Sequence, residues 1–404
     1  MRYLFVHQNF PGQFLHLVRH LAAAGQHELV FITEANENRI PGVRKILYRI
    51  DRPAASGTFR DAQEFEMATL RAQAVARTAA QLKSLGFTPD IIIGHHGWGE
   101  LLNLHDVWPG APLLGYHEFY YRTAGLDVNF DPEFPTPEAA YARIRAKNAV
   151  NLLALSNPGH GQAPTHFQRS TYPAWAQPAI TLVPEGVNLA TCRPDPALRA
   201  APFELGPLRI APHESLVTYV ARDLEPYRGF HVVMRALPRL LRARPDLRVV
   251  LVGGDGVSYG AKLAGTTWRE WLLSEVGPLD PDRVHFPGKL DYAQYVRLLQ
   301  RSDAHVYLTY PFVASWSLRE ALACGCAVVA SDTAPVQEFV TEGETGRLTP
   351  CLDPARLAER VLETVEERDR TATMRAAARG WAEANLRMAD HLAAYEALIG
   401  RLTG

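Results

Sequence analysis

Two arginines six residues apart distinguish the segment TYVARDLEPYRGF, residues 218–230. Arg222 follows an apolar run typical of a buried strand, and Arg228 comes just before a stretch with helical periodicity. Guanidinium groups bind phosphate oxygens through paired hydrogen bonds, so such a pair beyond a strand suits a diphosphate. The alternative is that both arginines form ion pairs with Asp223 and Glu225 on a solvated loop.

The segment YPFVASWSLREALACGCAVVASD, residues 310–332, has the order of a strand end, a loop, a helix and a buried strand. Ser317 is expected to begin the helix, and Glu320, three residues later, completes the pattern of a capping box. The functional alternative is that the first N–H groups of the helix face a phosphate and that Glu320 accepts hydrogen bonds from ligand hydroxyl groups. Both can hold, because a carboxylate has two oxygens.

The segment HQNFPGQF, residues 7–14, interrupts a buried-strand pattern with Pro11-Gly12 before a helical pattern begins. Gly12 has no Cβ, so a ligand can approach its backbone, and the following helix offers free N–H groups to an anion. The simpler interpretation is a tight turn between strand and helix.

Histidines also follow predicted strands, at His95-His96 and at His117-Glu118. They raise a metal site as an alternative, but the sequence has no His-Glu-x-x-His and no helical ligand pair at i, i+4. The glycine-rich LVGGDG, residues 251–256, lacks the spacing of a dinucleotide fingerprint and of a P-loop. We therefore expect no resident metal or cofactor.

Short apolar runs alternate with helical patterns, which predicts an α/β chain with two doubly wound parallel sheets facing each other across a cleft. Candidate strands of the first half lie at residues 3–6, 28–32, 90–93, 112–116, 151–155 and 179–183. Candidate strands of the second half lie at residues 215–220, 248–252, 283–286, 304–308 and 327–330. A Pro- and Ala-rich linker is expected at 183–215. The expected domains are 1–190 and 191–385, with 386–404 a C-terminal helix for which we consider packing back on the first domain.

Length and composition fit this organisation. A chain of 404 residues exceeds the size of a single core, and a net charge of −1 gives no electrostatic argument for a nucleic-acid partner. The four cysteines form no disulfide pattern, and no signal peptide or membrane span is evident, so we expect a cytoplasmic protein. The arginine-rich stretch 235–248 is expected to be a solvated face; contact with the inner face of a membrane is the minority alternative.

In order and spacing, these segments resemble the retaining glycosyltransferases of family four, which have the GT-B arrangement of two facing Rossmann-like domains. The resemblance covers essentially the whole chain. It rests on six segments: HQNFPGQF, LVPEGVN (182–188), RDLEPYRG (222–229), VHFPGKL (284–290), SLREALACGCAVVASD (317–332) and QEFVTEGETGRL (337–348). One position departs from the family, because Phe312 stands where the first Glu of a paired motif is expected. A phenyl ring cannot accept the hydrogen bonds of that carboxylate.

The resemblance implies a role for each matching residue. Arg222 and Arg228 hold the donor diphosphate, Glu320 accepts from the ribose hydroxyls, and His117 lies near the donor sugar. The remaining implied substrate contacts are Gly12, Gln13, Lys289, Leu290, Ser315, Trp316 and Ser317.

The implied activity is metal-independent transfer of a hexosyl-like unit from a UDP- or GDP-linked sugar, with anomeric retention. The implied acceptor is a carbohydrate, lipid-linked or other glycosyl acceptor in bacterial polysaccharide or glycoconjugate synthesis. Three alternatives stay open: a non-catalytic sugar-nucleotide binding subunit, a GT-B-type epimerase, and a metal-dependent hydrolase that uses His95, His96 and His117. The sequence leaves the donor sugar, its nucleobase, the acceptor and the oligomeric state open.

Overall fold

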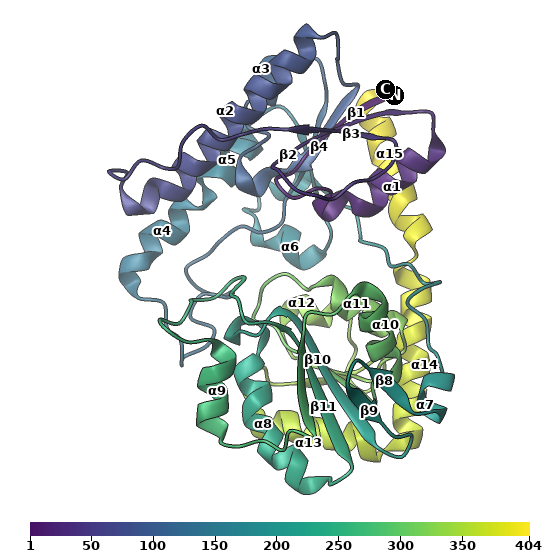
Figure 1. Cartoon of the computed structure of the whole chain (residues 1–404). Coiled ribbons are helices and arrows are strands. Elements are labelled where there is room, and N and C mark those ends of the chain that lie inside the picture. The colour runs from purple at the N-terminus through teal and green to yellow at the C-terminus, as the bar shows by residue number, and fades with distance from the viewer. The chain divides into compact units, whose positions relative to one another are not determined.

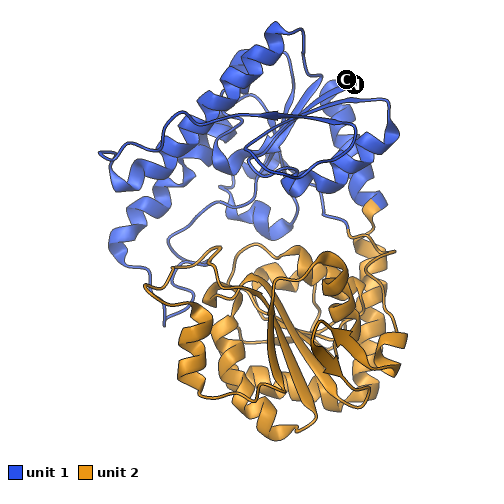
Figure 2. Ribbon diagram, in the orientation of Figure 1, with its two compact units in different colours: residues 1–186, 389–404 blue, residues 187–388 orange.

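Two parallel β-sheets, one in each of two units, organise the computed structural model, which describes residues 1–404 (Figure 1). Unit 1 comprises Met1–Gly186 and Ala389–Gly404, and unit 2 comprises Val187–Met388 (Figure 2). We expected the corresponding boundaries after residues 190 and 385.

Unit 1 contains a seven-stranded parallel sheet with the order β3-β2-β1-β4-β5-β6-β7. Its strands are β1 (Arg2–Val6), β2 (Glu28–Thr33), β3 (Val43–Leu47), β4 (Ile91–His95), β5 (Leu113–Tyr116), β6 (His160–Ala163) and β7 (Ile180–Leu182). The longer helices are α1 (Leu15–Ala24), α2 (Gln63–Ser84), α5 (Asn148–Ser156) and α15 (Met388–Thr403). The shorter ones are η1 (Gly12–Phe14), η2 (Arg60–Ala62), η3 (His96–Trp98), α3 (Leu104–Val107), η4 (Glu138–Ala140), α4 (Tyr141–Ala146), α6 (His166–Thr171) and η5 (Gln177–Ala179).

The apolar run of β1 is buried on both faces of this sheet, as a continuous hydrophobic strand requires. Phe5 packs with α1 and with Tyr395 of α15, whereas Leu4 and Val6 pack against α2 and α3. Helix α15, yellow in Figure 1, therefore belongs to the core of unit 1 although it ends the chain.

The strand expected at 151–155 is wrong, because this segment forms α5. Val150, Asn151 and Ala154 are buried while Leu152 and Leu153 are exposed, which is the pattern of a helix face. A short apolar run is compatible with a strand or a helix. Here the segment forms a helix that packs one face against unit 1. Strands β3 and β6 escaped prediction, since VRKIL lies at a sheet edge and HGQA has almost no apolar side chain.

Unit 2 contains a six-stranded parallel sheet with the order β12-β11-β10-β13-β14-β15. Its strands are β10 (Ser215–Asp223), β11 (Leu247–Gly254), β12 (Val284–Gly288), β13 (Ala304–Tyr307), β14 (Val328–Ser331) and β15 (Arg347–Thr349). Its helices are α7 (Ala197–Ala200), η6 (Pro226–Arg228), α8 (Phe230–Ala243), α9 (Trp268–Val276), α10 (Tyr292–Arg301), α11 (Trp316–Ala323), α12 (Ala334–Gln337), α13 (Pro354–Glu366) and α14 (Arg368–Asn385).

The segment expected to be a linker is partly folded. It contains the antiparallel hairpin β8 (Phe203–Leu205) and β9 (Leu208–Ile210). Phe203 and Ile210 are fully buried and pack with Leu216 of β10. Alternating apolar residues on each strand give this short hairpin one buried face, which its Pro- and Ala-rich flanks obscured.

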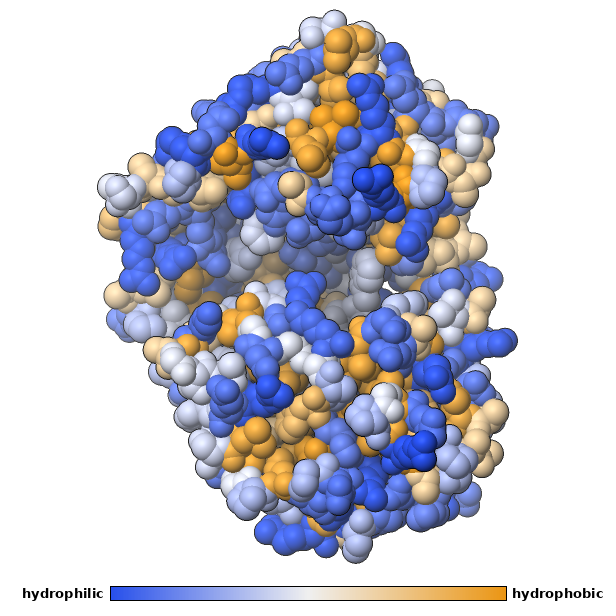
Figure 3. Space-filling model, in the orientation of Figure 1, coloured by the Kyte–Doolittle hydropathy of each residue, from blue (hydrophilic) through white to orange (hydrophobic).

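Both sheets have a position at which the chain changes direction across the sheet. It lies between β1 and β4 in unit 1 and between β10 and β13 in unit 2. Ligands of doubly wound sheets bind beyond the carboxyl ends of the strands at such positions. On the face shown in Figure 3, hydrophilic side chains predominate and hydrophobic ones are scattered. No helix of this chain has both the length and the hydropathy of a membrane-spanning segment.

Candidate functional site

Arg222 and Arg228 lie at the carboxyl end of β10 and in η6 directly after it. The Arg228 side chain is buried, and its Nη1 donates to Thr309 Oγ1 at 2.7 Å and to the Val313 carbonyl at 3.0 Å. Its guanidinium also lies 4.9 Å from the centre of the Tyr259 ring. Arg222 is exposed and has no hydrogen-bond or ion-pair partner in unit 2. One cation is therefore held rigidly, and the other is free to contact a ligand.

The alternative in which these arginines form ion pairs with Asp223 and Glu225 on a solvated loop is wrong. Asp223 accepts from Ser258 Oγ at 2.5 Å and lies 3.3 Å from Lys289 Nζ. Glu225 is fully buried, and its carboxylate accepts from the backbone N–H groups of residues 258–260 at 2.8–3.3 Å. Both carboxylates thus hold the loop after β11, which leaves Arg222 unpaired.

The expected capping box of Ser317 and Glu320 is also wrong. Helix α11 begins at Trp316 with Ser315 as its N-cap residue, and no side chain caps its first N–H groups. The Ser315 and Ser317 hydroxyl oxygens lie 2.6 Å apart, and the Ser315 N–H donates to Tyr307 Oη at 2.8 Å. The start of α11, which no side chain caps, carries the partial positive charge of a helix N-terminus, and this charge suits an anion.

Glu320 is held by hydroxyl groups instead of by its own helix. Its carboxylate accepts from Tyr292 Oη at 2.8 Å and from Tyr295 Oη at 2.9 Å, both on α10. Burial raises the pKa of Glu320, and the two tyrosine hydroxyls act in the opposite direction. Each carboxylate oxygen keeps a lone pair that can accept from a ligand hydroxyl.

Phe312 belongs to an aromatic cluster beside Arg228. Its ring centre lies 5.4 Å from that of Tyr227 and 5.2 Å from that of Tyr259, and Tyr310 lies 5.0 Å from Tyr227. Phe312 is buried. The position at which the resemblance implies a carboxylate is therefore an apolar wall next to a guanidinium.

The residues predicted to bind the donor in unit 2 share one edge of the sheet. The segments that follow β10, β12 and β13, including η6 and the first half of α11, carry them, and these strands lie within four consecutive positions of the sheet. Lys289 is exposed, whereas Leu290, Ser315, Trp316, Ser317 and Glu320 are half-buried. Gly229, next to Arg228, has a φ of +70°, and a Cβ there would lie 2.4 Å from Leu308 Cβ. Only glycine fits this turn.

The carboxyl edge of the unit 1 sheet carries histidines. His7, His95 and His117 end or directly follow the adjacent strands β1, β4 and β5, and His96 follows β4. All four are buried, with ring centres 5.5 Å apart for His7–His95 and 4.8 Å apart for His96–His117. Burial lowers the pKa of His7 and of His117 to about 3, so both rings are neutral near pH 7.

His7 is a candidate site residue that we did not single out in the sequence, although it occupies the same place after its strand as His117 does. Its Nδ1 accepts from the Asn9 N–H at 2.8 Å. Gly12 has a φ of +56°, and a Cβ there would lie 3.0 Å from the His7 ring. The Pro-Gly break thus folds the chain over this imidazole.

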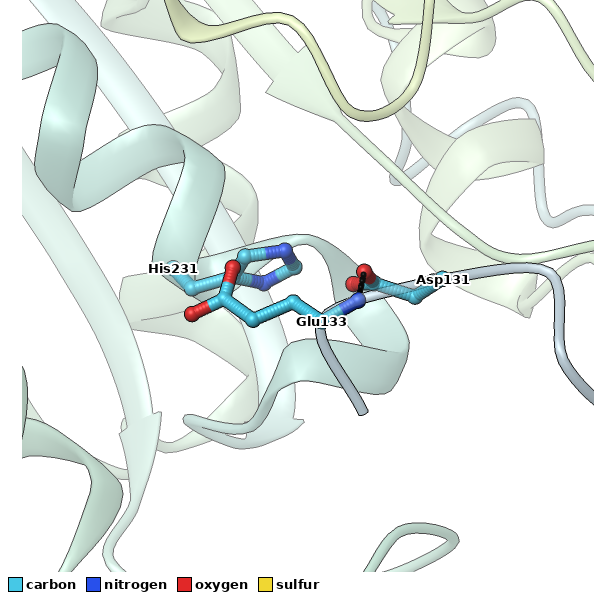
Figure 4. Close-up of side chains that lie close together, drawn as sticks. All are labelled: Asp131, Glu133 and His231. Atoms are coloured by element: carbon cyan, nitrogen blue, oxygen red, sulfur yellow. Dashed lines mark hydrogen bonds between the residues drawn. The ribbon is translucent and has the colours of Figure 1, made fainter. Parts of the chain in front are cut away.

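These histidines do not form a compact ligand set. No three of their nitrogens lie within 4.8 Å of one another, so the metal-dependent hydrolase has no preformed ligand set in unit 1. Figure 4 shows Asp131, Glu133 and His231. The Glu133 N–H donates to Asp131 Oδ1 at 2.9 Å within unit 1, whereas His231 lies on α8 of unit 2. We assign no site to these three residues.

Two family models match the two halves of this chain. Residues 25–192 match the glycosyl transferase family 4 group, and residues 204–381 match the glycosyl transferases group 1. The chain belongs to the group 1 glycosyltransferases of family 4. The family predicted from the six segments is confirmed.

Relatives of this family member include the D-inositol 3-phosphate glycosyltransferase of Streptomyces scabiei, 30% identical over 303 residues, which are 72% of this chain and 62% of that protein. The phosphatidyl-myo-inositol mannosyltransferase of Mycolicibacterium smegmatis is 29% identical over 190 residues, covering 46% of this chain and 42% of that protein. The chain therefore spans about three fifths of the length of the first relative and less of the second.

Solved structures of glycosyltransferases have the same fold. Sucrose-phosphate synthase from Thermosynechococcus elongatus is 20% identical with a TM-score of 0.74, and covers 100% of this chain and 99% of its own. Anabaena HepE in complex with UDP and glucose is 18% identical with a TM-score of 0.69 over all of both chains. The GT-B fold class, with two doubly wound parallel sheets, is confirmed.

Proposed function

We propose that this chain transfers a sugar from a nucleotide diphosphate sugar, UDP- or GDP-linked, to a hydroxyl-bearing acceptor, with retention and without a required metal. The observation that carries this proposal is the group of cationic donors at one edge of the unit 2 sheet. The free Arg222, the fixed Arg228 and the uncapped start of α11 together suit a diphosphate. Names of relatives and neighbours that include UDP and glycosyl transfer support the donor class.

The chemistry follows from the leaving group. The bond between the anomeric carbon and the diphosphate oxygen breaks, and the acceptor oxygen bonds to the anomeric carbon on the same face. The acceptor proton passes to an oxygen of the departing diphosphate, so no side-chain base is needed. Arg222, Arg228 and the first N–H groups of α11 stabilise the negative charge that develops there.

The remaining residues position the donor. Glu320 accepts hydrogen bonds from the ribose hydroxyls through lone pairs that its two tyrosines leave free. Lys289 and Leu290 lie beside the base, and Ser315 to Ser317 contact the phosphates and sugar. His117 is neutral, so one ring nitrogen donates and the other accepts at sugar hydroxyls.

The acceptor class follows from the relatives named for inositol phosphate and phosphatidyl-inositol. We propose a polyol, carbohydrate or lipid-linked acceptor in bacterial polysaccharide or glycoconjugate synthesis. The arginine-rich stretch gives little support to a membrane-facing surface, because four of its five arginines pair with carboxylates and only Arg242 has no such partner. These pairs are Arg235–Glu275, Arg239–Glu359, Arg244–Asp246 and Arg248–Glu214.

Donor turnover in Arg222→Gln tests this function. Because Arg222 is exposed and unpaired, the variant should melt at the wild-type temperature. Its kcat/KM with the preferred UDP- or GDP-sugar should fall by about two orders of magnitude, as expected for loss of a transition-state contact. Arg242→Gln, an exposed arginine of α8, is the matched control and should keep wild-type turnover. Wild-type turnover in Arg222→Gln would contradict the proposal.

The aromatic cluster around Phe312 favours a second candidate, a sugar-nucleotide binding subunit without transfer activity. It lacks the carboxylate that the resemblance implies for the donor sugar. Tight nucleotide binding with no turnover over a broad donor and acceptor panel would favour this candidate. Conversion of the donor in the absence of any acceptor would instead indicate an epimerase.

A further inference from the structure

A cavity of about 260 Å³ lies at the opposite edge of the unit 2 sheet. Ser215, the first residue of β10, and Asp303, just before β13, form part of its wall. Arg199 of α7, residues 212–214 before β10 and a row of residues on α13 and α14 form the rest. The cavity is therefore built at the amino ends of the strands whose carboxyl ends carry Arg222 and the loop to α11.

Cationic groups outnumber carboxylates around this cavity. Asp303 Oδ2 lies 2.6 Å from Arg301 Nη1, and its Oδ1 lies 3.6 Å from Arg199 Nη1 and 3.8 Å from Arg375 Nη2. The Asp303 carboxylate thus forms ion pairs with three guanidinium groups. It also accepts a hydrogen bond from the Leu216 N–H at 2.8 Å.

The second carboxylate of the wall, Glu214, is already neutralised. It accepts from both Arg248 Nε and the Ala211 N–H at 2.8 Å. Ser215 Oγ donates to Asp246, which pairs with Arg244. No acidic group is left over for the surplus arginines, and an unbalanced charge in a partly buried wall is costly without a counter-ion.

Several donors at the wall have no acceptor. Arg368, on the first turn of α14, and His213 are exposed and have no hydrogen bond or ion pair. The Nε atom of Arg375 is buried and has no hydrogen-bond partner. Arg199 Nη2 and Arg375 Nη2, by contrast, donate to the Ser302 carbonyl at 2.6 and 3.1 Å, which fixes both side chains in place.

We propose that this cavity binds a small phosphate dianion, either inorganic phosphate or a short phosphate monoester, through Arg199, Arg368 and Arg375. Guanidinium groups match phosphate geometry, and a dianion would balance the surplus positive charge. The volume lies below the range of about 300–1,000 Å³ typical of drug-sized ligands, which favours a small ligand over a nucleotide sugar. The site is independent of the proposed transfer activity.

Isothermal titration of the full chain with inorganic phosphate and, separately, with glycerol 3-phosphate tests this site. At the physiological ionic strength of about 0.15 M, at least one probe should bind saturably with a Kd below about 1 mM. Tighter binding of inorganic phosphate assigns the site to the free ion, and tighter binding of the ester assigns it to a monoester. Binding of neither probe would overturn the proposal.

Three variants locate the binding. Arg368→Gln should weaken it about tenfold while the melting temperature without ligand stays at the wild-type value. Arg370→Gln, an exposed neighbour outside the cavity wall, should bind like wild type. Arg222→Gln, at the other edge of the sheet, should also bind like wild type. Loss of phosphate binding in Arg222→Gln with full binding in Arg368→Gln would overturn the proposal. This readout does not depend on turnover, so it stands apart from the outcome of the transfer assay.

Discussion

The carboxyl edge of the unit 2 sheet carries guanidinium groups, whereas the same edge of the unit 1 sheet carries buried imidazoles. Both edges arise from the same doubly wound plan, with strand order reversing between β1 and β4 and between β10 and β13. In unit 2 the cations and the uncapped start of α11 suit a diphosphate. In unit 1 burial keeps His7 and His117 neutral, so that edge suits hydroxyl groups rather than charge. The shared fold determines where the carboxyl edge of each sheet lies. The residues just after each strand determine whether that edge is cationic or neutral.

Removal of the fixed cation should have the largest effect. Arg228→Ala removes the hydrogen bonds to Thr309 and to the Val313 carbonyl and leaves both acceptors buried. We expect turnover to fall by more than about two orders of magnitude and the free energy of unfolding to fall by about 2–4 kcal/mol. Turnover assays and urea unfolding measure the two effects. A fully active Arg228→Ala protein would break the contrast between the two edges.

Loss of the Glu320 charge should affect nucleotide binding more than stability. Glu320→Gln keeps the shape but weakens acceptance from ribose hydroxyls, so we expect the Kd for the preferred nucleoside diphosphate to rise about tenfold or more. Tyr295→Phe removes a supporting hydroxyl and should give a smaller rise. Unchanged nucleotide binding in Glu320→Gln would contradict a ribose contact. The Glu320 carboxylate would then only connect α11 to α10.

The histidine edge should make stability depend on pH. The unfolded His117 binds a proton below about pH 6.5, but the folded residue does so only near pH 3. Between these values the unfolded state holds more protons, so stability falls as pH is lowered, by up to about 1.4 kcal/mol per pH unit for each such histidine. His117→Gln should flatten this slope in urea unfolding between about pH 5 and pH 7.5. His166→Gln, an exposed histidine of the same unit, is the control, and equal slopes in all three proteins would contradict the assignment.

The turn over His7 should give the smallest effect. Gly12→Ala forces a side chain into a φ of +56° and places its Cβ 3.0 Å from the imidazole. We expect a loss of about 1–2 kcal/mol in the free energy of unfolding, measured by urea denaturation. Gly25→Ala has a similar φ of +68° but open space around its Cβ, so it isolates the backbone cost. Equal losses of unfolding free energy in both variants would show that the contact with His7 contributes nothing beyond the backbone cost.

The sequence predicted features that depend on short-range pattern. The buried strands that precede Arg222 and Pro11-Gly12 could be recognised from continuous apolar runs. Arg222 and Arg228 could be singled out because they come just after such a run and stand six residues apart. The two unit folds could therefore be expected from the alternation of these runs with helices.

Features that depend on distant partners could not be predicted. Glu320 looked like a capping residue, but its partners Tyr292 and Tyr295 are 28 and 25 residues away. Glu225 looked like an ion-pair partner of the arginines, but backbone N–H groups 33–35 residues away satisfy it. The prediction of a strand at 151–155 was wrong because a short apolar run does not show whether its periodicity is that of a strand or of a helix.

Binding of UDP and GDP to the wild type, Arg222→Gln and Arg242→Gln tests the central claim most directly. If the cationic edge of unit 2 holds a diphosphate, one of the two nucleotides should bind the wild type and Arg242→Gln equally. Its Kd should rise at least about tenfold in Arg222→Gln, a loss of about 1.4 kcal/mol. An unchanged Kd for both nucleotides in Arg222→Gln would contradict the account.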